Sequence, residues 1–233
     1  MKNWIGLGVI ALLFSACGEK TTTKEVVLAT FEDSISFAIG SDVALDVKGG
    51  ISQQGLDTQL NAELLIAGFR DAYLNDTAKF SKEDGQAVIS EFFNKKKKEE
   101  GDNNVAKGQD FLAENLSKPG VKATASGLQY IVLKEGEGAS PLLSSQVRVH
   151  YTGKLLSGKV FDSSIERNEP VEFFVRSVIP GWTEALQLMK PGAEYKLFIP
   201  SDLAYGAQGG PRGSAIGPNE VLIFDVKLID VLN

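Results

Sequence analysis

The spacing of apolar residues along the chain changes near residue 120. Before the breaker Lys118-Pro119-Gly120, apolar residues recur every three or four positions, which is the spacing of helices that bury one face. After it, apolar and polar residues alternate, as in strands of a sheet with one buried face. The sequence therefore predicts a helical N-terminal part and a mainly β C-terminal part.

Three helices are predicted before the breaker. Asp33 or Ser34 can cap the first, and Gly49-Gly50 is expected to end it. Asn61 and Ser81 precede the second and third helices as caps. The predicted ranges are 33–48, 61–74 and 82–116.

The third predicted helix changes character along its length. It begins with the apolar cluster Val88, Ile89, Phe92 and Phe93, becomes almost wholly charged at 95–100, and ends with a thinner apolar stripe. A helix that is polar all round in its middle is expected to bridge solvent between two packed ends. Gly101 and Gly108 each weaken its continuity by about 1 kcal/mol. The lysine run Lys95–Lys98 is followed at once by two glutamates, so a solvated face is favoured over a nucleic-acid or membrane site.

Helices with such modest apolar faces make a poor core for a single chain. We therefore expect residues 31–94 to form a dimerisation region that buries these faces against a second copy. Residues 95–123 would then be a connecting helix and linker, and 124–233 a separate domain.

Five segments of the C-terminal part alternate with period two, and one short helix accompanies them. The helix opens near Trp182, where Trp182, Ala185, Leu186 and Met189 form one stripe, and Lys190-Pro191-Gly192 stops it. Five strands with one apolar face each need a covering layer, and this helix is the candidate. The predicted fold is α+β: an antiparallel sheet wrapped over one short helix, preceded by an all-α region.

Composition and charge exclude several classes of function. The 233-residue chain has 24 basic and 30 acidic residues and a net charge of −6, which argues against nucleic acid as a partner. With one Cys and one His, the chain has too few ligands for a zinc site built from these residues. No metal or cofactor is expected.

The single cysteine lies in a characteristic N-terminal context. Lys2 is followed by an apolar run from Trp4 to Phe14, and the small residues Ser15 and Ala16 precede Cys17. This resembles a bacterial lipoprotein signal, cleaved after residue 16, with lipid attached to Cys17. Residues 17–30 would be a flexible tether, and the protein would be anchored in the bacterial envelope, at the outer membrane. An ordinary secretory signal with a chance cysteine is the alternative.

Several aromatic residues stand at strand ends and loop starts, where ligand sites often form. They belong to five ordered motifs: Val149-His150-Tyr151-Thr152-Gly153, Lys159-Val160-Phe161-Asp162-Ser163-Ser164, Val178-Ile179-Pro180-Gly181-Trp182, Ala204-Tyr205-Gly206 and Leu222-Ile223-Phe224-Asp225-Val226. In order and spacing these motifs resemble the FKBP-type peptidyl-prolyl cis-trans isomerases. With the helical N-terminal part and lipid signal, the chain resembles the macrophage infectivity potentiator subgroup, whose members dimerise through their N-terminal helices.

The resemblance implies an isomerase acting on proline-containing polypeptides, with a pocket that can also bind macrolides such as tacrolimus or rapamycin. Trp182 would be its floor, the Tyr205 hydroxyl and the Ile179 backbone N–H would hold substrate carbonyls, and Arg167 would pair with Asp162. Val171 stands where many relatives have Phe, which thins one wall. The catalytic set would be Tyr151, Phe161, Asp162, Trp182, Tyr205 and Phe224, and the substrate-binding set Val178, Ile179, Ile216, Arg167 and Val171.

For three residues a structural role is favoured over a catalytic one. His150 faces away from its strand neighbours and is expected on the back of the sheet, and Ser163 and Ser164 are expected to cap a turn. One functional alternative also stays open: a chaperone whose pocket binds apolar peptide without turnover.

Overall fold

The computed structural model describes residues 26–75 and 79–232. The predicted signal segment, Cys17 and most of the predicted tether lie outside these residues. The chain divides near residue 80 into two compact units, which are described in turn. Among the described helices, none has both the length and the apolar character needed to cross a bilayer.

The first unit contains the helices α1 (Phe31–Gln53) and α2 (Ala62–Leu74). The cap of α1 is Thr30, not Asp33 or Ser34. The Thr30 hydroxyl accepts a hydrogen bond from the Asp33 N–H at 3.1 Å, and the Asp33 carboxylate accepts one from the Thr30 N–H at 2.9 Å. Asp33 is therefore the reciprocal partner of a capping box. Asn61 caps α2 as predicted, because its side chain accepts from the Leu64 N–H at 3.1 Å.

The predicted end of α1 at Gly49-Gly50 is wrong. Glycine weakens a helix without breaking it, and α1 continues to Gln53. It ends at Gly55, which has a left-handed φ of 63°. The Gly55 N–H donates to the Ser52 carbonyl at 3.0 Å and the Leu56 N–H to the Ile51 carbonyl at 3.1 Å, the pair of bonds of a Schellman motif.

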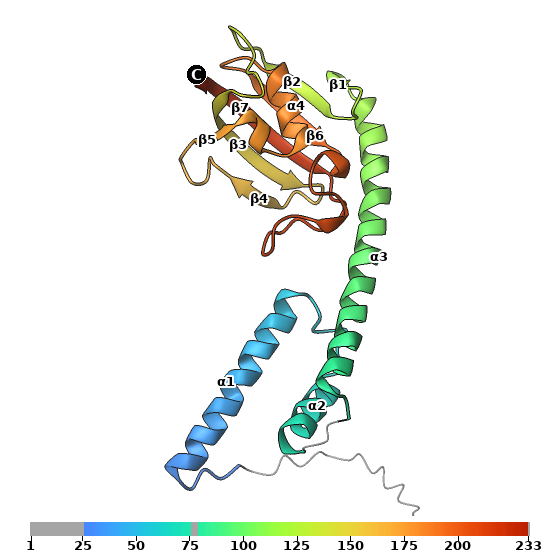
Figure 1. Ribbon diagram of the computed structural model, residues 1–233, viewed down its shortest axis with the longest axis vertical. Helices are drawn as coiled ribbons and strands as arrows, with labels where there is room; N and C mark the ends of the chain where they lie inside the picture. Colours follow the sequence, from blue (N-terminus) through green and yellow to red (C-terminus); the bar gives the residue numbers. More distant parts are fainter. Residues whose placement is uncertain (1–25, 76–78, 233) are drawn as a thin grey trace, which may run out of the picture. The chain divides into compact units, whose positions relative to one another are not determined.

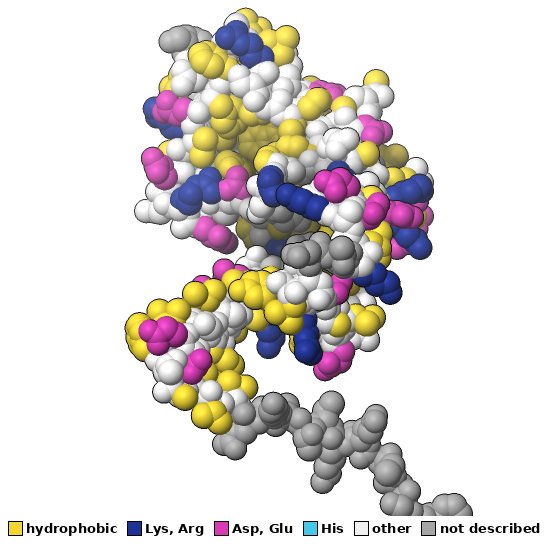
Figure 2. Space-filling view, turned by 60° about the horizontal axis from the view of Figure 1, so that its bottom comes forward, with side chains coloured by type: hydrophobic (Ala, Val, Ile, Leu, Met, Phe, Trp, Pro, Cys, Tyr) yellow, Lys and Arg dark blue, Asp and Glu magenta, His cyan; other side chains and the backbone are white. Residues whose placement is uncertain are grey.

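Most apolar side chains of this unit are exposed. Neither α1 nor α2 has a buried residue, and Leu56 is the one buried hydrophobic side chain in the part of the unit that the structure describes. Among the exposed ones are Leu64 at 71%, Phe69 at 55% and Tyr73 at 78% of full exposure. Figure 2 shows hydrophobic side chains along the helix next to the grey N-terminal trace.

The second unit contains an antiparallel sheet of seven strands in the order β1-β2-β6-β7-β3-β4, with β5 also paired to β3 (Figure 1). The sequence predicted five strands. The two that it missed are β1, which has only three residues, and β4, whose sequence Val-Phe-Asp-Ser does not alternate. The strands are β1 (Val121–Ala123), β2 (Gln129–Lys134), β3 (Gln146–Leu155), β4 (Val160–Ser163), β5 (Val171–Phe174), β6 (Glu194–Ile199) and β7 (Leu222–Leu232).

The short helix α4 (Pro180–Leu188) packs on the apolar face of this sheet. It begins at Pro180, two residues before the predicted start, because proline suits the first helical position, where no N–H is needed. Trp182, Ala185, Leu186 and Met189 are all buried, as their spacing predicted. At Gly181 the helix approaches β6 so closely that a Cβ would lie 2.5 Å from the Ile199 side chain. Three short 3-10 turns complete the fold: η1 (Val175–Ser177), η2 (Ser201–Leu203) and η3 (Gly206–Gln208).

The long helix α3 (Lys82–Leu116) is continuous, and the Ser81 hydroxyl accepts from the Asp84 N–H at 3.0 Å. Its charged middle, residues 95–100, is largely exposed, and its C-terminal half packs beside the sheet (Figure 1). Its buried residues are Gly101, Gly108 and Asn115. Not all residues of the predicted apolar stripe are covered by this packing, because Val105 and Leu116 remain 38% and 50% exposed.

Candidate active site

Trp182, in the first turn of α4, is surrounded by three other aromatic rings. Its ring centroid lies 5.3 Å from that of Tyr151, 5.2 Å from Phe224 and 5.7 Å from Phe173. The interplanar angles are 86°, 90° and 68°, so each contact is the edge-to-face arrangement that aromatic quadrupoles favour. Trp182 itself is 5% exposed.

These rings and Phe161 form what we call the aromatic hollow: Tyr151, Phe161, Phe173, Trp182 and Phe224. Phe161 meets Phe224 at 5.5 Å with an angle of 88°. Figure 2 shows a depression lined by hydrophobic side chains in the body of the second unit. Of the predicted substrate-binding residues, Ile216 belongs to the hydrophobic core that contains Trp182 and Phe224, and Val178 and Ile179 pack against that core.

Phe173 belongs to this aromatic cluster, although the sequence analysis did not name it as a candidate. Val171 lies two residues earlier on β5, is partly exposed and pairs with Val149 of β3, whereas the Phe173 ring contacts Trp182. The alternation of Val171, Phe173 and Val175 already placed Phe173 on the inner face of its strand. The Phe173 ring therefore lies close to the position where Val171, in place of the Phe of many relatives, was expected to thin the wall of the pocket.

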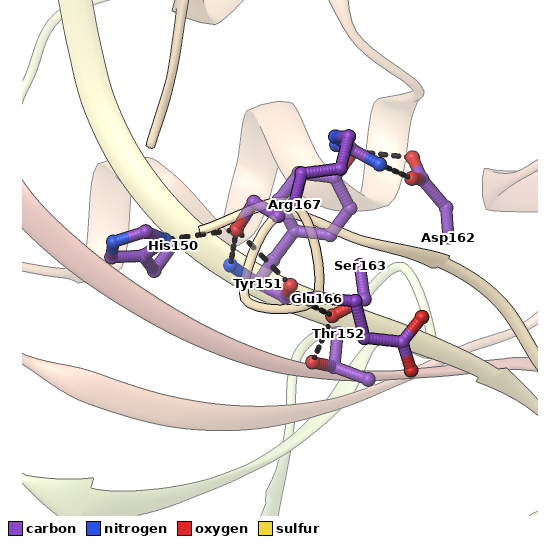
Figure 3. Close-up of polar contacts among 8 residues, drawn as sticks. His150, Tyr151, Thr152, Asp162, Ser163, Glu166 and Arg167 are labelled. Atoms are coloured by element: carbon purple, nitrogen blue, oxygen red, sulfur yellow. Dashed lines mark hydrogen bonds and ion pairs between the residues drawn. The ribbon is translucent and has the colours of Figure 1, made fainter. Parts of the chain in front are cut away.

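A polar group of three side chains borders the hollow (Figure 3). The Asp162 carboxylate accepts hydrogen bonds from the Tyr151 hydroxyl and the Arg167 guanidinium, and Arg167 also donates to the Tyr151 hydroxyl oxygen at 3.3 Å. The predicted pairing of Arg167 with Asp162 is therefore present. Tyr151 is not at a strand end as expected. It lies in the middle of β3, and it reaches Asp162 because β4 pairs with β3 there.

The burial and hydrogen bonds of these three side chains shift their pKa values. Partial burial alone raises the pKa of Asp162, but the bonds from Tyr151 and Arg167 outweigh it, so the pKa lies below the ordinary 3.8. Burial, and then the bond to the carboxylate, raise the pKa of the Tyr151 phenol. The bond to Asp162 raises the pKa of Arg167 further. At neutral pH the group is a fixed carboxylate, a neutral phenol and a guanidinium.

Two donors expected to hold substrate carbonyls are available. The Tyr205 side chain is 37% exposed. Among the hydrogen bonds of the described residues, none comes from the Tyr205 hydroxyl or the Ile179 N–H. Ile179 is the residue before α4, so its N–H lies at the positive end of a helix that begins beside Trp182.

His150 lies on the opposite face of β3 from Tyr151, and its side chain has a structural role. Its Nδ1 is 3.0 Å from the Ser164 hydroxyl, which also accepts from the Tyr151 N–H at 2.8 Å (Figure 3). Ser163 caps a turn, since its hydroxyl accepts from the Glu166 N–H at 3.2 Å. These contacts give all three residues structural roles, but the Ser164 hydroxyl bonds to β3 and does not cap a turn as expected.

The arrangement provides an apolar, aromatic floor with a few polar groups at its edge. Such a site can bind an apolar side chain and the adjoining peptide backbone. In the part of the chain that the structure describes, no three His, Cys, Asp or Glu side chains cluster closely enough to hold a metal ion.

Comparison with known families covers most of the chain. Residues 138–229 match the family described as FKBP-type peptidyl-prolyl cis-trans isomerase. Residues 32–132 match the domain amino terminal to FKBP-type peptidyl-prolyl isomerase.

Individual relatives agree with these matches. The chain is 42% identical to the outer membrane protein MIP of Legionella longbeachae, over 90% of this chain and 89% of that protein. It is 40% identical to the peptidyl-prolyl cis-trans isomerase Mip of Coxiella burnetii, over 88% of each. The crystal structure of FkpA from Escherichia coli matches with a TM-score of 0.67 and 35% identity, over 88% of this chain and 98% of that one. The chain therefore belongs to the FKBP-type peptidyl-prolyl cis-trans isomerases, and it is an enzyme that accelerates rotation about the bond preceding proline.

Proposed function

We propose that the aromatic hollow is the site of this isomerisation. The observation that carries the proposal is the enclosure of Trp182 by three edge-to-face rings with the Asp162 group at their border. In this proposal the substrate proline rests on Trp182, between Tyr151, Phe161 and Phe224. The Ile179 N–H and the Tyr205 hydroxyl hold the carbonyls on either side.

The chemistry requires an environment for a twisted amide. Rotation about a peptide bond has a barrier of about 18–20 kcal/mol because resonance is lost at the transition state, and uncatalysed X–Pro exchange takes tens to hundreds of seconds. The twisted amide is less polar than the planar one, so a dry aromatic surface favours it. Donors fixed on the neighbouring carbonyls hold the chain on either side of the rotating bond. Asp162 acts by holding Tyr151 and Arg167 in place rather than by moving a proton.

The test compares residues 18–233 with the variant Asp162→Val on a Leu-Pro or Phe-Pro peptide. We expect kcat/KM to fall about tenfold or more in the variant, and rapamycin to compete with the peptide in the parent protein. Glu172→Gln is the matched control, because Glu172 pairs with Arg148 at 2.7 Å and at a similar exposure, outside the hollow. Equal loss in both variants, or unchanged activity in Asp162→Val, would overturn the assignment.

A non-catalytic chaperone role for the hollow is the second candidate, favoured by its largely apolar lining. Tyr205→Phe and Val171→Phe separate the two functions. If turnover changes strongly while suppression of client aggregation does not, the hollow carries the isomerase activity and another surface carries the chaperone function. Parallel loss of both would place peptide capture in the hollow.

We further propose that the protein is a lipid-anchored envelope protein whose clients are exported polypeptides. Two observations support this: the signal-like segment before Cys17, and the similarity to the Legionella relative, which is named as an outer membrane protein. Radiolabelled palmitate should enter the full-length protein in a bacterial host and be absent from Cys17→Ser. Equal labelling of both would contradict the anchor.

We also propose that residues 31–94 form a homodimer. The exposed apolar side chains of α1 and α2, together with Val88 and Ile89 at 53% and 57% exposure, support it. A second copy would remove this surface from water, at about 25 cal/mol for each Å² buried.

A further inference from the structure

The C-terminal half of α3 contacts the loop that follows Tyr205. The Asn104 side chain donates to the Pro218 carbonyl at 2.9 Å, and the Asn219 side chain donates to the Gly101 carbonyl at 3.4 Å. One turn earlier, Lys97 donates to the Gln208 side chain at 3.3 Å. These bonds join residues more than 110 positions apart, so the 205–221 loop is held by the helix as well as by its own strand connections.

The contact depends on glycines in α3. A Cβ at Gly108 would lie 2.8 Å from Val221 Cγ2, and one at Gly101 would lie 3.1 Å from the Asn219 side chain. Val221 is 3% exposed and β-branched, so its side chain has little freedom to give way. On the loop side, a Cβ at Gly217 would lie 2.6 Å from a Glu100 oxygen. Gly101, Asn104 and Gly108 lie three and four residues apart, on one side of the helix, and we call them the α3 docking face.

The same loop carries two of the predicted site residues, Tyr205 and Ile216. It begins at Tyr205, and Ile216 packs in the core cluster with Trp182 and Phe224. The loop is closed internally, because the Asn219 N–H donates to the Gly206 carbonyl at 2.8 Å and the Gly210 N–H to the Ile216 carbonyl at 3.0 Å. Ile216 precedes Pro218, which Asn104 holds, by two residues. A shift of the loop on α3 would therefore move Ile216 within the core cluster that also contains Trp182 and Phe224.

We propose that the α3 docking face is a positioning element of the active site. It sets the place of Ile216 and thereby helps determine which side chain before proline is accepted. This proposal rests on the assignment of the hollow as the site of isomerisation. None of its three residues belongs to the aromatic hollow or to the Asp162 group. They act through the loop, by fixing where its backbone can lie.

Gly108→Ala in residues 18–233 tests the proposal, with two readouts. The first is the Ile216 δ1-methyl resonance, which we expect to shift. The second is the ratio of kcat/KM for a Leu-Pro peptide to that for an Ala-Pro peptide, which we expect to change by about three- to tenfold. General destabilisation lowers both rates equally by reducing the amount of folded enzyme, so it leaves the ratio unchanged.

Three further variants test whether the contact between Gly108 and Val221 causes these changes. Gly85→Ala is the matched control, because Gly85 lies in the same helix and a Cβ there would meet only Phe80, at 3.9 Å. Gly108→Ala with Val221→Ala removes the clashing Cγ2 and should return both readouts toward the parent values. Val221→Ala alone measures the effect of the lost methyls.

The outcomes separate this proposal from the one on which it rests. An unchanged methyl resonance or an unchanged ratio in Gly108→Ala overturns the positioning role, as does a double variant that behaves no better than the single one. Full activity in Asp162→Val overturns the assignment of the hollow instead, and the methyl resonance still reports whether α3 places Ile216.

Discussion

At the residue scale, the Asp162 carboxylate decides the state of the polar group beside the hollow. Its folded pKa is depressed because the bonds from Tyr151 and Arg167 outweigh partial burial. A depressed carboxylate pKa stabilises the fold at pH values above the unfolded pKa, and this contribution is lost as pH falls through the folded pKa. The bonds are therefore intact throughout the neutral and mildly acidic range.

We predict that kcat/KM of the parent enzyme is constant from about pH 8 to about pH 5, because the Asp162 carboxylate stays ionised there. It should fall as pH drops below the ordinary carboxyl range. Asp162→Asn should show lower activity and no such fall from this group. The measurement is a pH profile of peptide isomerisation under conditions where circular dichroism shows folded protein. A parent profile that declines between pH 7 and pH 5 would contradict the prediction.

Phe173 and Phe174 offer a comparison between adjacent positions on β5. The Phe173 ring contacts Trp182 at 5.7 Å, whereas Phe174 is 42% exposed on the other face. We predict that Phe173→Leu lowers kcat/KM several-fold and costs about 1 kcal/mol of stability, or about 2–4 °C in melting temperature. Phe174→Leu should change both far less. Kinetics and thermal unfolding check this, and equal effects at the two positions would remove Phe173 from the site.

The sequence was informative about single residues wherever a motif fixed both spacing and residue type. Trp182, Tyr151, Phe224 and Asp162, all within the quoted motifs, come together in the structure, and Arg167, which the family resemblance assigned, pairs with Asp162. Phe173 lay within a predicted strand but outside the quoted motifs. Its part in the site depends on which strand residue faces α4, and period-two alternation gives only the face, not the neighbour.

At the element scale, α3 shows that the packed side of a helix cannot always be predicted from its apolar residues. Its docking face consists of glycines and an asparagine, so no hydrophobic stripe marks it. Glycines in a polar helix were interpreted as weak points, whereas two of them are where another segment approaches closely. Similarly, α1 ends at Gly55 because this residue has a left-handed φ and two backbone hydrogen bonds close the helix there. Gly49 and Gly50 are also glycines, but they do not have the left-handed φ, so the helix continues through them.

The contact between α3 and the 205–221 loop also includes an acidic residue with an unfavourable charge. Burial, and then the nearby Glu100 carboxylate, raise the pKa of Glu220, and Lys107 opposes this only in part. A raised carboxylate pKa means that the charged form is penalised in the folded protein. The penalty is complete above the folded pKa and is relieved as pH falls toward the unfolded value.

We therefore predict that Glu220→Gln raises the melting temperature by a few degrees at pH 8 and by less at pH 4. Glu99→Gln is the control, because Glu99 lies on the same helix as Glu100 and its side chain is 66% exposed. Thermal unfolding at the two pH values makes the comparison. A Glu220→Gln variant that is less stable than the parent at pH 8 would show that the carboxylate has a favourable partner.

At the scale of the whole molecule, the two units differ in how completely they bury their apolar residues. The second unit encloses a core of residues from its sheet and α4, whereas the described part of the first unit has Leu56 as its one buried hydrophobic side chain. The sequence predicted this contrast from three helices with modest faces. It could not predict which residues would be covered, because a helix with apolar residues on several sides, as in α1, has no single preferred face.

The proposed dimer gives the last prediction. Residues 18–233 should have twice the mass of one chain by light scattering, because α1 and α2 leave side chains such as Leu64 and Phe69 at 71% and 55% exposure. A charge placed in a buried interface is strongly unfavourable, so Leu64→Asp with Phe69→Asp should give the mass of one chain and reduce the helical circular dichroism signal. Leu142→Asp is the control: Leu142 is 69% exposed but belongs to the sheet unit, and this variant should stay dimeric. A parent protein with the mass of one chain would contradict the dimer and leave the exposed apolar side chains of α1 and α2 to another partner.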